Sequence, residues 1–334
     1  MGRRGRGRRR GHRQRRRVTD VPDLTKEPGP EPGQDRVPPE AIVAIPVRHW
    51  GRWAGALVVC ALLAWLAWSF VNSDIRWDVV GEYLTYDRIV EGAANTLWIT
   101  VLSMLIGLVL GVLLAVMRLS DNPVLSNVAW GYIWFFRGTP VLVQLVLWYN
   151  LSIVFDTMNF GFYKDETNDI ITPFVAALLG LGLNEAAYMA EIARAGILSV
   201  DHGQTEAAQA LGMNKAKTTR RIVLPQAMRV IIPPTGNEFI NMLKTSSLVS
   251  VVQFEDLFWA ADIVGSRGNL VMELFVVATV WYLMLTTVFS IGQYYLERHY
   301  AKGSDRALPP TPLQRMRAHL TSFRTKSQVG GTTV

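Results

Sequence analysis

The sequence predicts an all-α, polytopic membrane protein with about six transmembrane helices and a helical cytoplasmic connection. Three observations carry this prediction. The 334 residues are 50% hydrophobic and only 18% charged, whereas a soluble domain carries about 25% charged residues. The apolar residues are gathered into runs close to the ~20 residues that cross ~30 Å of hydrocarbon. Basic and acidic connections alternate between these runs.

Six apolar runs follow one another along the chain. They lie at roughly 53–71, 94–117, 139–155, 171–195, 230–252 and 270–295. The third run is short, the fourth and fifth contain charges, and Pro233-Pro234 and Gly236 interrupt the fifth. Because helices and closed barrels alone satisfy the backbone inside a bilayer, each run is expected to be a transmembrane helix.

The charge of the connections predicts the orientation. Basic connections lie in the cytoplasm by the positive-inside rule. Residues 1–52, 194–229 and those after the sixth run are basic, whereas 72–92, 156–170 and 253–268 are acidic. We therefore expect six crossings and cytoplasmic N- and C-termini.

The connection 118–138 would lie inside by parity. Its aromatic residues Trp130, Tyr132 and Trp134 are typical of a membrane–water interface. Arg137, just before the third run, is then expected to extend toward lipid headgroups.

The N-terminal tail differs from the rest of the chain. Residues 1–52 hold 14 Lys or Arg and 6 Asp or Glu and are rich in Pro and Gly, a composition that predicts disorder. The Arg block could contact nucleic acid or anionic lipid, but a solvated cytoplasmic tail is the simpler interpretation. The run 53–71 has no cleavage-site pattern after it, which predicts an uncleaved span.

Several kinds of protein are excluded or disfavoured by the residues. A single cysteine, Cys60, excludes a disulfide scaffold, and the five His are scattered, so no metal or cofactor site is expected. No Ser/His/Asp set or zinc-protease motif is present, and no Gly-Lys dipeptide of a phosphate-binding loop occurs. The chain is therefore expected to be neither an enzyme nor an ATPase.

The segment 199–225 is the one long, polar, helix-forming connection. Asp201 can cap a first helix, Gly212 suits its end, and Asn214 can cap a second helix. Pro225 ends that helix or opens the next. The low-relief face of the first helix suits insertion into a partner's groove, and its one acid, Glu206, can pair with a partner or with Arg220 or Arg221. An ordinary surface helix is the alternative.

The spacing in this segment carries a resemblance. Glu206-Ala207-Ala208, Gly212, and Ile222-x-Leu224-Pro225 are similar at all seven positions to the signature loop of the membrane subunits of bacterial ABC importers. The segments 136–144, 187–192 and 243–250 resemble the polar amino-acid branch (histidine, glutamine, glutamate, arginine, opine type). The resemblance covers roughly residues 88–298 and leaves out both tails.

The resemblance implies a type I importer transmembrane domain at 88–298, preceded by an extra N-terminal helix and external loop at 53–87 and followed by a basic cytoplasmic tail at 299–334. It implies that residues 201–225 dock a separate ATP-binding subunit, present as a dimer, through the contact Glu206 to Gly212. It also implies an extracytoplasmic solute-binding protein, a second permease subunit (identical or homologous), a polar amino-acid cargo and the cytoplasmic (inner) cell membrane.

Polar residues in the fifth run are candidates for the substrate path. Asn237, Asn241 and Lys244 recur on one helical face, and Glu238 and Thr245 lie on the adjacent strip. Charges inside a bilayer face a bundle interior or a water-filled path, and Glu238 with Lys244 supplies the two signs that a zwitterion needs. An internal network that holds this helix to its neighbours explains them equally well.

The fourth run carries a second set of candidates. Glu191 and Arg194 are three residues apart and can pair. Gly182, Ala186 and Ala190 recur every four residues and allow close helix contact, either between subunits or within the chain.

Other function classes fit less well. A stand-alone ion-coupled carrier or channel is the main alternative, but a carrier commonly has inverted repeats, which are not evident. A nucleic-acid or scaffold protein would leave the intramembrane charges unexplained. The sequence therefore favours the permease subunit of an ABC importer for polar amino acids.

Overall fold

The computed structural model describes residues 50–159, 161 and 164–300. The chain divides into two units, Met1–Phe70 and Val71–Val334. The tails expected at 1–52 and 299–334 lie outside the described residues, apart from 50–52 and 299–300.

The first unit contributes helix α1 (Trp50–Val71). Its stretch Trp53–Val71 has a mean hydropathy of 2.2 and no charged residue. A helix of 22 residues is about 33 Å long, which is enough to cross the hydrocarbon core. The predicted extra N-terminal span is thus a continuous apolar helix.

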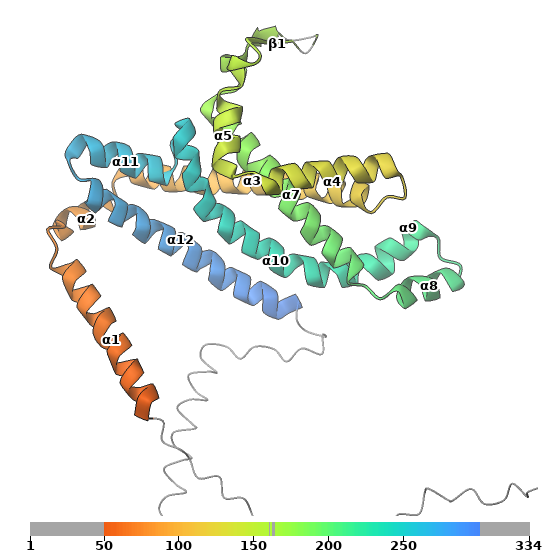
Figure 1. The fold of residues 1–334 in the computed structure, drawn as a ribbon, viewed down its shortest axis with the longest axis horizontal. Helices are drawn as coiled ribbons and strands as arrows, with labels where there is room; N and C mark the ends of the chain where they lie inside the picture. Colours follow the sequence, from red (N-terminus) through yellow and green to blue (C-terminus); the bar gives the residue numbers. More distant parts are fainter. Residues whose placement is uncertain (1–49, 160, 162–163, 301–334) are drawn as a thin grey trace, which may run out of the picture. The chain divides into compact units, whose positions relative to one another are not determined.

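The second unit is helical with one short hairpin (Figure 1). Its α-helices are α2 (Trp77–Tyr83), α3 (Asp87–Arg118), α4 (Pro123–Gly138), α5 (Val141–Tyr149), α6 (Thr167–Ile170), α7 (Pro173–Leu198), α8 (His202–Ala210), α9 (Lys215–Thr218), α10 (Leu224–Thr245), α11 (Leu257–Gly268) and α12 (Val271–Tyr300). Two 3₁₀ segments, η1 (Leu151–Ile153) and η3 (Ser246–Val252), and a π-helical turn, η2 (Thr219–Val223), connect them. Strands β1 (Thr157–Asn159) and β2 (Lys164–Glu166) pair antiparallel, with Thr157 opposite Glu166.

The centre of this unit is the contact between α3 and α7. Small residues allow the two helices to pack closely. A Cβ atom on Gly111 would collide with the Met189 side chain and lie 3.0 Å from the Ala186 carbonyl oxygen. Ala186 and Ala190, two members of the predicted small-residue stripe, are fully buried here. The stripe therefore packs within the chain, which is one of the two outcomes left open.

Helix α4 lies within the connection expected between the second and third runs. Residues 123–138 form a helix packed on α3 and α7, and the interfacial location of its aromatic residues stays a prediction. Pro123 begins it and Asn122 caps it by accepting a hydrogen bond from the Val124 N–H at 2.9 Å. Ala129, Ile133 and Phe136 form its buried face, while Trp130 and Trp134 are exposed and stack on each other.

The number of crossings is not settled by helix length. Among the described residues, four helices are long and apolar enough to span a membrane: α1, α3, α7 and α12. The predicted third run forms α5, of 9 residues, followed by η1, and the fifth forms α10 and η3. The six crossings therefore remain a prediction.

Helix α10 is continuous through Pro233 and Pro234. A proline inside a helix removes a backbone donor and leaves a carbonyl unpaired one turn earlier. Gln293 of the neighbouring α12 bonds to the helix beside these prolines: its Nε2 donates to the Pro233 carbonyl oxygen at 2.7 Å and to Glu297 Oε1 at 3.0 Å. Gly236 leaves room for this side chain, because a Cβ there would collide with the Gln293 amide.

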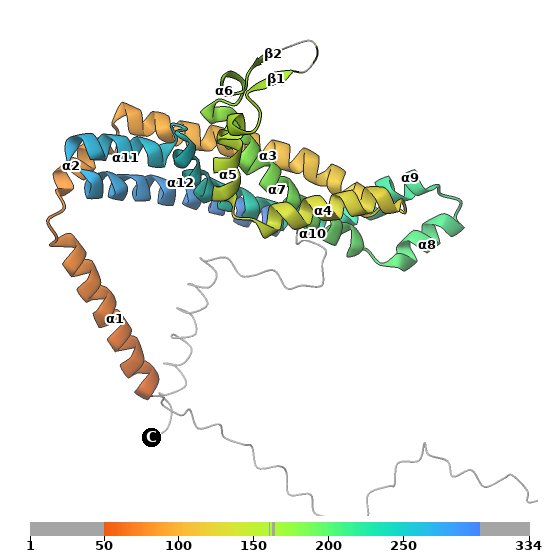
Figure 2. The same ribbon diagram turned by 45° about the horizontal axis from the view of Figure 1, so that its top comes forward.

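Two of the three acidic connections lie opposite the basic connection 194–229, whereas the third, which carries β1 and β2, projects beyond α5 (Figures 1 and 2). Helices α2 and α11, from the acidic connections, lie at one end, and α8 and α9, from the basic connection, lie at the other (Figures 1 and 2). Arg76, which precedes α2, forms an ion pair with Glu273 of α12 at 3.2 Å, and this contact ties the acidic end together.

Candidate functional site

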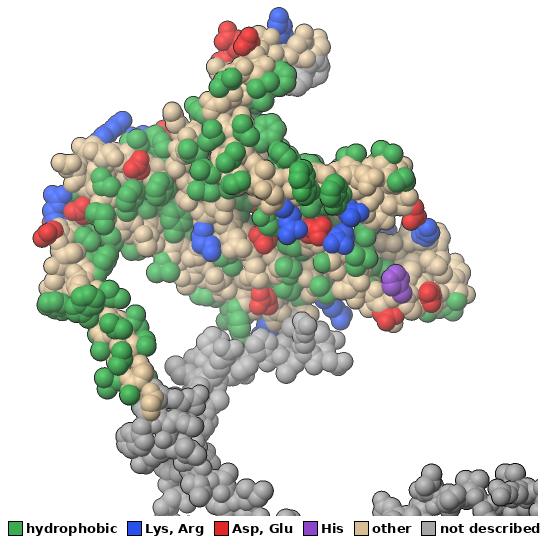
Figure 3. Space-filling model, viewed as in Figure 1, with side chains coloured by type: hydrophobic (Ala, Val, Ile, Leu, Met, Phe, Trp, Pro, Cys, Tyr) green, Lys and Arg blue, Asp and Glu red, His purple; other side chains and the backbone are tan. Residues whose placement is uncertain are grey.

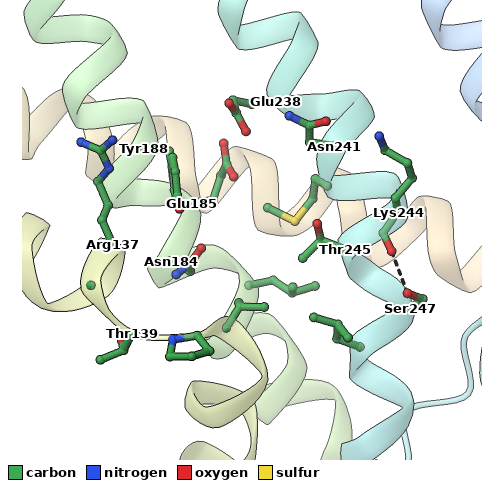
Figure 4. A pocket seen from close by; sticks show the side chains of 16 residues that line it. Arg137, Thr139, Asn184, Glu185, Tyr188, Glu238, Asn241, Lys244, Thr245 and Ser247 are labelled. Atoms are coloured by element: carbon green, nitrogen blue, oxygen red, sulfur yellow. Dashed lines mark hydrogen bonds between the residues drawn. The ribbon is translucent and has the colours of Figure 1, made fainter.

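A cavity of about 880 Å³ opens between the α4–α5 turn, α7, α10 and η3 (Figure 4). This volume lies in the range of ~300–1,000 Å³ typical of small-molecule sites. The polar side chains that line it are Arg137, Thr139, Asn184, Glu185, Tyr188, Glu238, Asn241, Lys244, Thr245 and Ser247. Leu181, Met242 and Leu248 are among its apolar walls.

The α10 wall contains four of the five residues predicted for the substrate path. Glu238, Asn241, Lys244 and Thr245 line the cavity, because positions three and four apart share a face of a helix. The fifth, Asn237, is exposed and is not among the lining residues. Figure 4 shows the Glu238 and Lys244 side chains at separate places along this wall.

The α7 wall contributes a carboxyl group that the sequence did not place in the path. Glu185 is only 4% exposed, and its Oε1 has no hydrogen-bond partner. Its stem packs on α3 at Gly107, where an added Cβ would lie 2.6 Å from Glu185 Cγ. Figure 4 shows Glu185 and Glu238 reaching the cavity from facing helices.

Arg137, which was expected to extend toward lipid headgroups, makes contacts within the chain. Its guanidinium lies over the Tyr188 ring, 5.2 Å from the centroid, and its Nη1 is 4.0 Å from Glu191 Oε2. Glu191 also pairs with Arg194 at 2.8 Å, which confirms the predicted pair. Arg137 therefore lines the cavity, and Glu191 of α7 is the acidic group nearest to its charge.

The turn between α4 and α5 is held by side-chain amides. The Gln144 Nε2 donates to the Phe136 carbonyl at 3.0 Å and to Thr139 Oγ1 at 2.7 Å. The Asn184 Nδ2 donates to the same Phe136 carbonyl at 2.9 Å. Gly138 and Pro140 interrupt the helix here, so these bonds replace the backbone pairing that the break removes. A polar Gln144 within the apolar run 139–155 is the sequence signal that could have indicated this turn.

Charged side chains gather on an otherwise apolar face. Figure 3 shows Lys and Arg beside Asp and Glu in the region where α4, α7 and α10 meet, with hydrophobic side chains around them. Charges of both signs inside an apolar bundle are characteristic of a substrate path or a buried polar network. Among the described residues, no group of three His, Cys, Asp or Glu could hold a metal ion.

The second candidate site is the loop 201–225, at the α8–α9 end. Asp201 Oδ1 accepts a hydrogen bond from the Gly203 N–H at 2.6 Å, and Asn214 Oδ1 accepts one from the Lys217 N–H at 2.9 Å. Both predicted caps are thus present. Helix α8 ends in a Schellman motif. In it, Met213 N–H bonds to the Ala208 carbonyl, and Gly212 N–H to the Gln209 carbonyl.

Gly212 makes that motif possible. Its φ of 79° lies in the left-handed region, which a residue with a Cβ enters at a cost. The first helix therefore stops where the sequence predicted, and the chain turns back into α9.

The seven signature residues differ in exposure. Glu206 and Ala207 are exposed, and Ala208 is buried against the rest of the loop. Glu206 has no ion-pair partner within 4.0 Å in the described part of the chain, so it does not pair with Arg220 or Arg221. Leu211, at the C-terminal end of the same helix, is 84% exposed. Such a face is open to a partner.

The remaining signature residues join the loop to the cavity wall. Ile222 lies in the π-helical turn η2, and Leu224 and Pro225 begin α10. Pro225 thus opens the next helix, the second of its two predicted roles. The chain runs from α9 through η2 into α10 without a loop, so the segment 201–225 is continuous with the helix that carries Glu238 and Lys244.

Comparison with known proteins agrees with this geometry. Residues 107–302 match the family model of the binding-protein-dependent transport system inner membrane component. The arginine transport system permease protein ArgU of Corynebacterium glutamicum is 48% identical over 294 residues, covering 86% of this chain and 90% of that protein. The probable glutamine ABC transporter permease protein GlnM of Bacillus subtilis is 35% identical over 232 residues, covering 70% and 99%.

A solved structure supports the same assignment. The chain is similar to one described as an amino acid ABC transporter with histidines, with 38% identity and a TM-score of 0.60, covering 68% of this chain and 100% of that one. The all-α fold class and the predicted resemblance are both confirmed by these matches. The chain therefore belongs to the family of binding-protein-dependent transport system inner membrane components, and it is the permease subunit of an ABC importer in the inner membrane.

Proposed function

We propose that this permease carries polar amino acids through the cavity between α4, α7 and α10, driven by ATP hydrolysis in a separate subunit that docks on residues 201–225. The observation that supports this most is the continuity of the chain from the docking loop into the cavity wall. The same helix, α10, begins at the signature residues Leu224 and Pro225 and ends at Lys244 and Thr245.

The cargo class follows from the lining. A polar amino acid carries a carboxylate and an ammonium group, and Lys244, Glu185 and Glu238 offer the opposite charges. Tyr188, Asn184 and Asn241 add hydrogen-bonding groups. The amino-acid permeases among the relatives support the same class.

The partners follow from the loop. An exposed, unpaired Glu206 on α8 and the exposed Leu211 at the end of that helix suit a groove with a positive rim. The contact Glu206 to Gly212 then receives one ATPase subunit of a dimer, while a second permease subunit completes the path. An extracytoplasmic binding protein delivers cargo at the end that carries α2 and α11, and α8, α9 and both termini then lie in the cytoplasm.

The domain bounds proposed are 53–87 for the extra helix with its external loop and 88–298 for the permease domain.

The experiment reverses the charge at one position of the loop, Glu206. In the assembled importer, Glu206→Arg is expected to lower ATP-driven uptake at least tenfold and to weaken association with the ATPase, because a charge-assisted contact becomes a repulsion. Asp121→Arg, a charge reversal at an exposed position between α3 and α4, is the matched control and keeps uptake. Normal uptake and ATPase association in Glu206→Arg would contradict the docking role.

A further inference from the structure

A second pocket, of about 460 Å³, lies at the α8–α9 end of the second unit (Figure 1). Its lining residues are Ala216, Lys217, Arg220 and Arg221. They belong to α9 and to the π-helical turn η2, and none of them lines the cavity between α7 and α10. The volume lies within the range typical of small-molecule sites. Because three of the four lining side chains are cations, the pocket is suited to an anion.

The local helix brings the three cations together. Lys217, Arg220 and Arg221 stand at positions i, i+3 and i+4, which share one face of a helix, and all three are exposed. Thr218 and Val223 are buried, so the other face of the segment packs on the rest of the unit. Turns of the π-helical kind are frequent at functional sites. The cations are therefore presented outward by a segment that is itself held in place.

The protein places no acidic group against these cations. Within residues 50–159, 161 and 164–300, no carboxylate lies within 4.0 Å of any of the three. The segment 194–229 contains only two acids, Asp201 and Glu206, and Asp201 Oδ1 accepts a hydrogen bond from the Gly203 N–H. Like charges on one face repel one another. An anion bound between them would remove that repulsion.

The residues beside the pocket indicate a membrane surface. Helix α10 follows η2 directly, and its Leu224 and Val230 are exposed. Leu198, at the end of α7 on the same side, is exposed as well. In a permease, exposed cations next to exposed apolar side chains are characteristic of the boundary between lipid headgroups and hydrocarbon. The pocket therefore lies where a lipid headgroup can reach it.

A lipid phosphate fits both sides of this boundary. Guanidinium groups bind phosphate oxygens through paired N–H donors, and a lysine ammonium group adds a compact positive charge. The acyl chains of the same lipid can then lie against Leu224 and Val230. A soluble phosphate would use the cations but not the apolar residues beside them. Basic pockets of this kind are suited to the headgroups of anionic lipids.

We propose that Lys217, Arg220 and Arg221 bind the phosphate group of an anionic lipid in the leaflet that faces α8 and α9. The bound lipid anchors the junction between the loop 201–225 and α10 at the membrane surface. The site goes beyond the proposed transport function, and it does not depend on which amino acid is carried.

The test counts the lipids bound to the permease–ATPase complex by native mass spectrometry. The probes are phosphatidylglycerol, which has a net negative charge, and phosphatidylcholine with the same acyl chains, whose phosphate is balanced by its own ammonium group. Each cation near a membrane surface adds affinity for anionic lipid, so the wild type is expected to bind phosphatidylglycerol about tenfold more tightly than phosphatidylcholine.

Three variants assign the preference to the pocket. The double variant Arg220→Gln/Arg221→Gln is expected to bring the ratio of the two affinities to within about threefold, because two of the three charges are lost. Arg220→Lys/Arg221→Lys keeps the charges and is expected to retain most of the preference. Arg229→Gln removes an exposed cation of α10 outside the pocket and is expected to leave the ratio unchanged.

The contrary outcomes are distinct. Equal binding of the two lipids by the wild type, or an equal loss of preference in Arg229→Gln, would overturn the site. Displacement of phosphatidylglycerol by millimolar inorganic phosphate would overturn the lipid as its occupant. Loss of the ATPase subunits from the double glutamine variant with an unchanged lipid preference would assign the cations to the ATPase instead. Each of these results leaves the proposed passage of amino acids untouched.

Discussion

The two long walls of the cavity are built in opposite ways. On one side, α7 packs on α3 through glycine and alanine, with Gly111, Ala186 and Ala190 leaving no space between the backbones. On the other, α10 contains two prolines, presents Glu238 and Lys244 to the cavity, and has Gln293 of α12 paired with one of its carbonyls. The first wall is closely packed through small residues, whereas the second presents charged groups to the cavity.

The largest effect is expected where the first wall is closest. Gly111→Ala forces a methyl group against Met189 and the Ala186 carbonyl, and overpacking of this kind costs about 1–3 kcal/mol of unfolding free energy. Thermal unfolding in nanodiscs measures it. Gly131→Ala on α4, where nothing lies within 4 Å, is the control and gains up to about 1 kcal/mol in helix propensity. Equal melting temperatures for the two variants would show that the α3–α7 contact is not tight.

On the second wall, Lys244→Met removes the only unpaired cation described in the cavity. Because a hydrogen bond to a charged group contributes about 1.5–3 kcal/mol, affinity for arginine, used as the probe amino acid, should fall by tenfold or more. Equilibrium binding checks this, with Lys164→Met in the exposed hairpin as the control. Unaltered affinity and selectivity would remove Lys244 from the path.

A smaller effect is expected at the proline break. Gln293→Leu removes the donor to the Pro233 carbonyl, and a net loss of about 0.5–1.5 kcal/mol follows from one hydrogen bond. Hydrogen exchange should be faster for the amides around 229–237 than in the wild type. Gln226→Leu, which removes the side-chain donor to the Ile222 carbonyl at the start of α10, outside 229–237, provides the comparison. Protection equal in both variants would mean that α12 does not stabilise this break.

The smallest effect is expected at Asn237, which the sequence placed in the path and the structure leaves exposed outside the cavity lining. Asn237→Ala should change arginine affinity by less than about 0.5 kcal/mol, the usual range for a surface substitution. Asn241→Ala, one turn later on the cavity wall, should weaken it measurably. A larger effect at Asn237 than at Asn241 would reverse the assignment of the two positions.

The contrast also explains what the sequence could predict. Features set by local chemistry were predicted correctly: the apolar α1, α3 and α12, the caps at Asp201 and Asn214, and the stop at Gly212. The resemblance at Glu206 to Pro225 led to the family because those residues are fixed in identity and spacing. Periodicity along one helix placed Glu238, Asn241, Lys244 and Thr245 together.

What the sequence missed depends on contacts between distant segments. The aromatic run 130–136 has the composition of an interfacial belt, but its buried face packs on α3 and α7 as part of α4. Arg137 and Glu185 reach the cavity because a broken helix and a glycine on another helix make room for them. The place of neither side chain follows from hydropathy, since tertiary packing decides which face of a helix lines a cavity.

The π-helical turn η2 determines where a single residue can be deleted between the loop and the cavity wall. Such a turn holds one residue more than an α-helical turn while the helices on either side keep their phase. Deleting a single residue within 219–223 would therefore convert it to regular helix and leave the cavity-lining residues of α10 in the same angular relation to the loop. The same deletion between 226 and 232 would rotate those residues by about 100° about the helix axis and turn Glu238 and Lys244 away from α7. Homologues that differ by one residue in this stretch should carry the difference inside the turn.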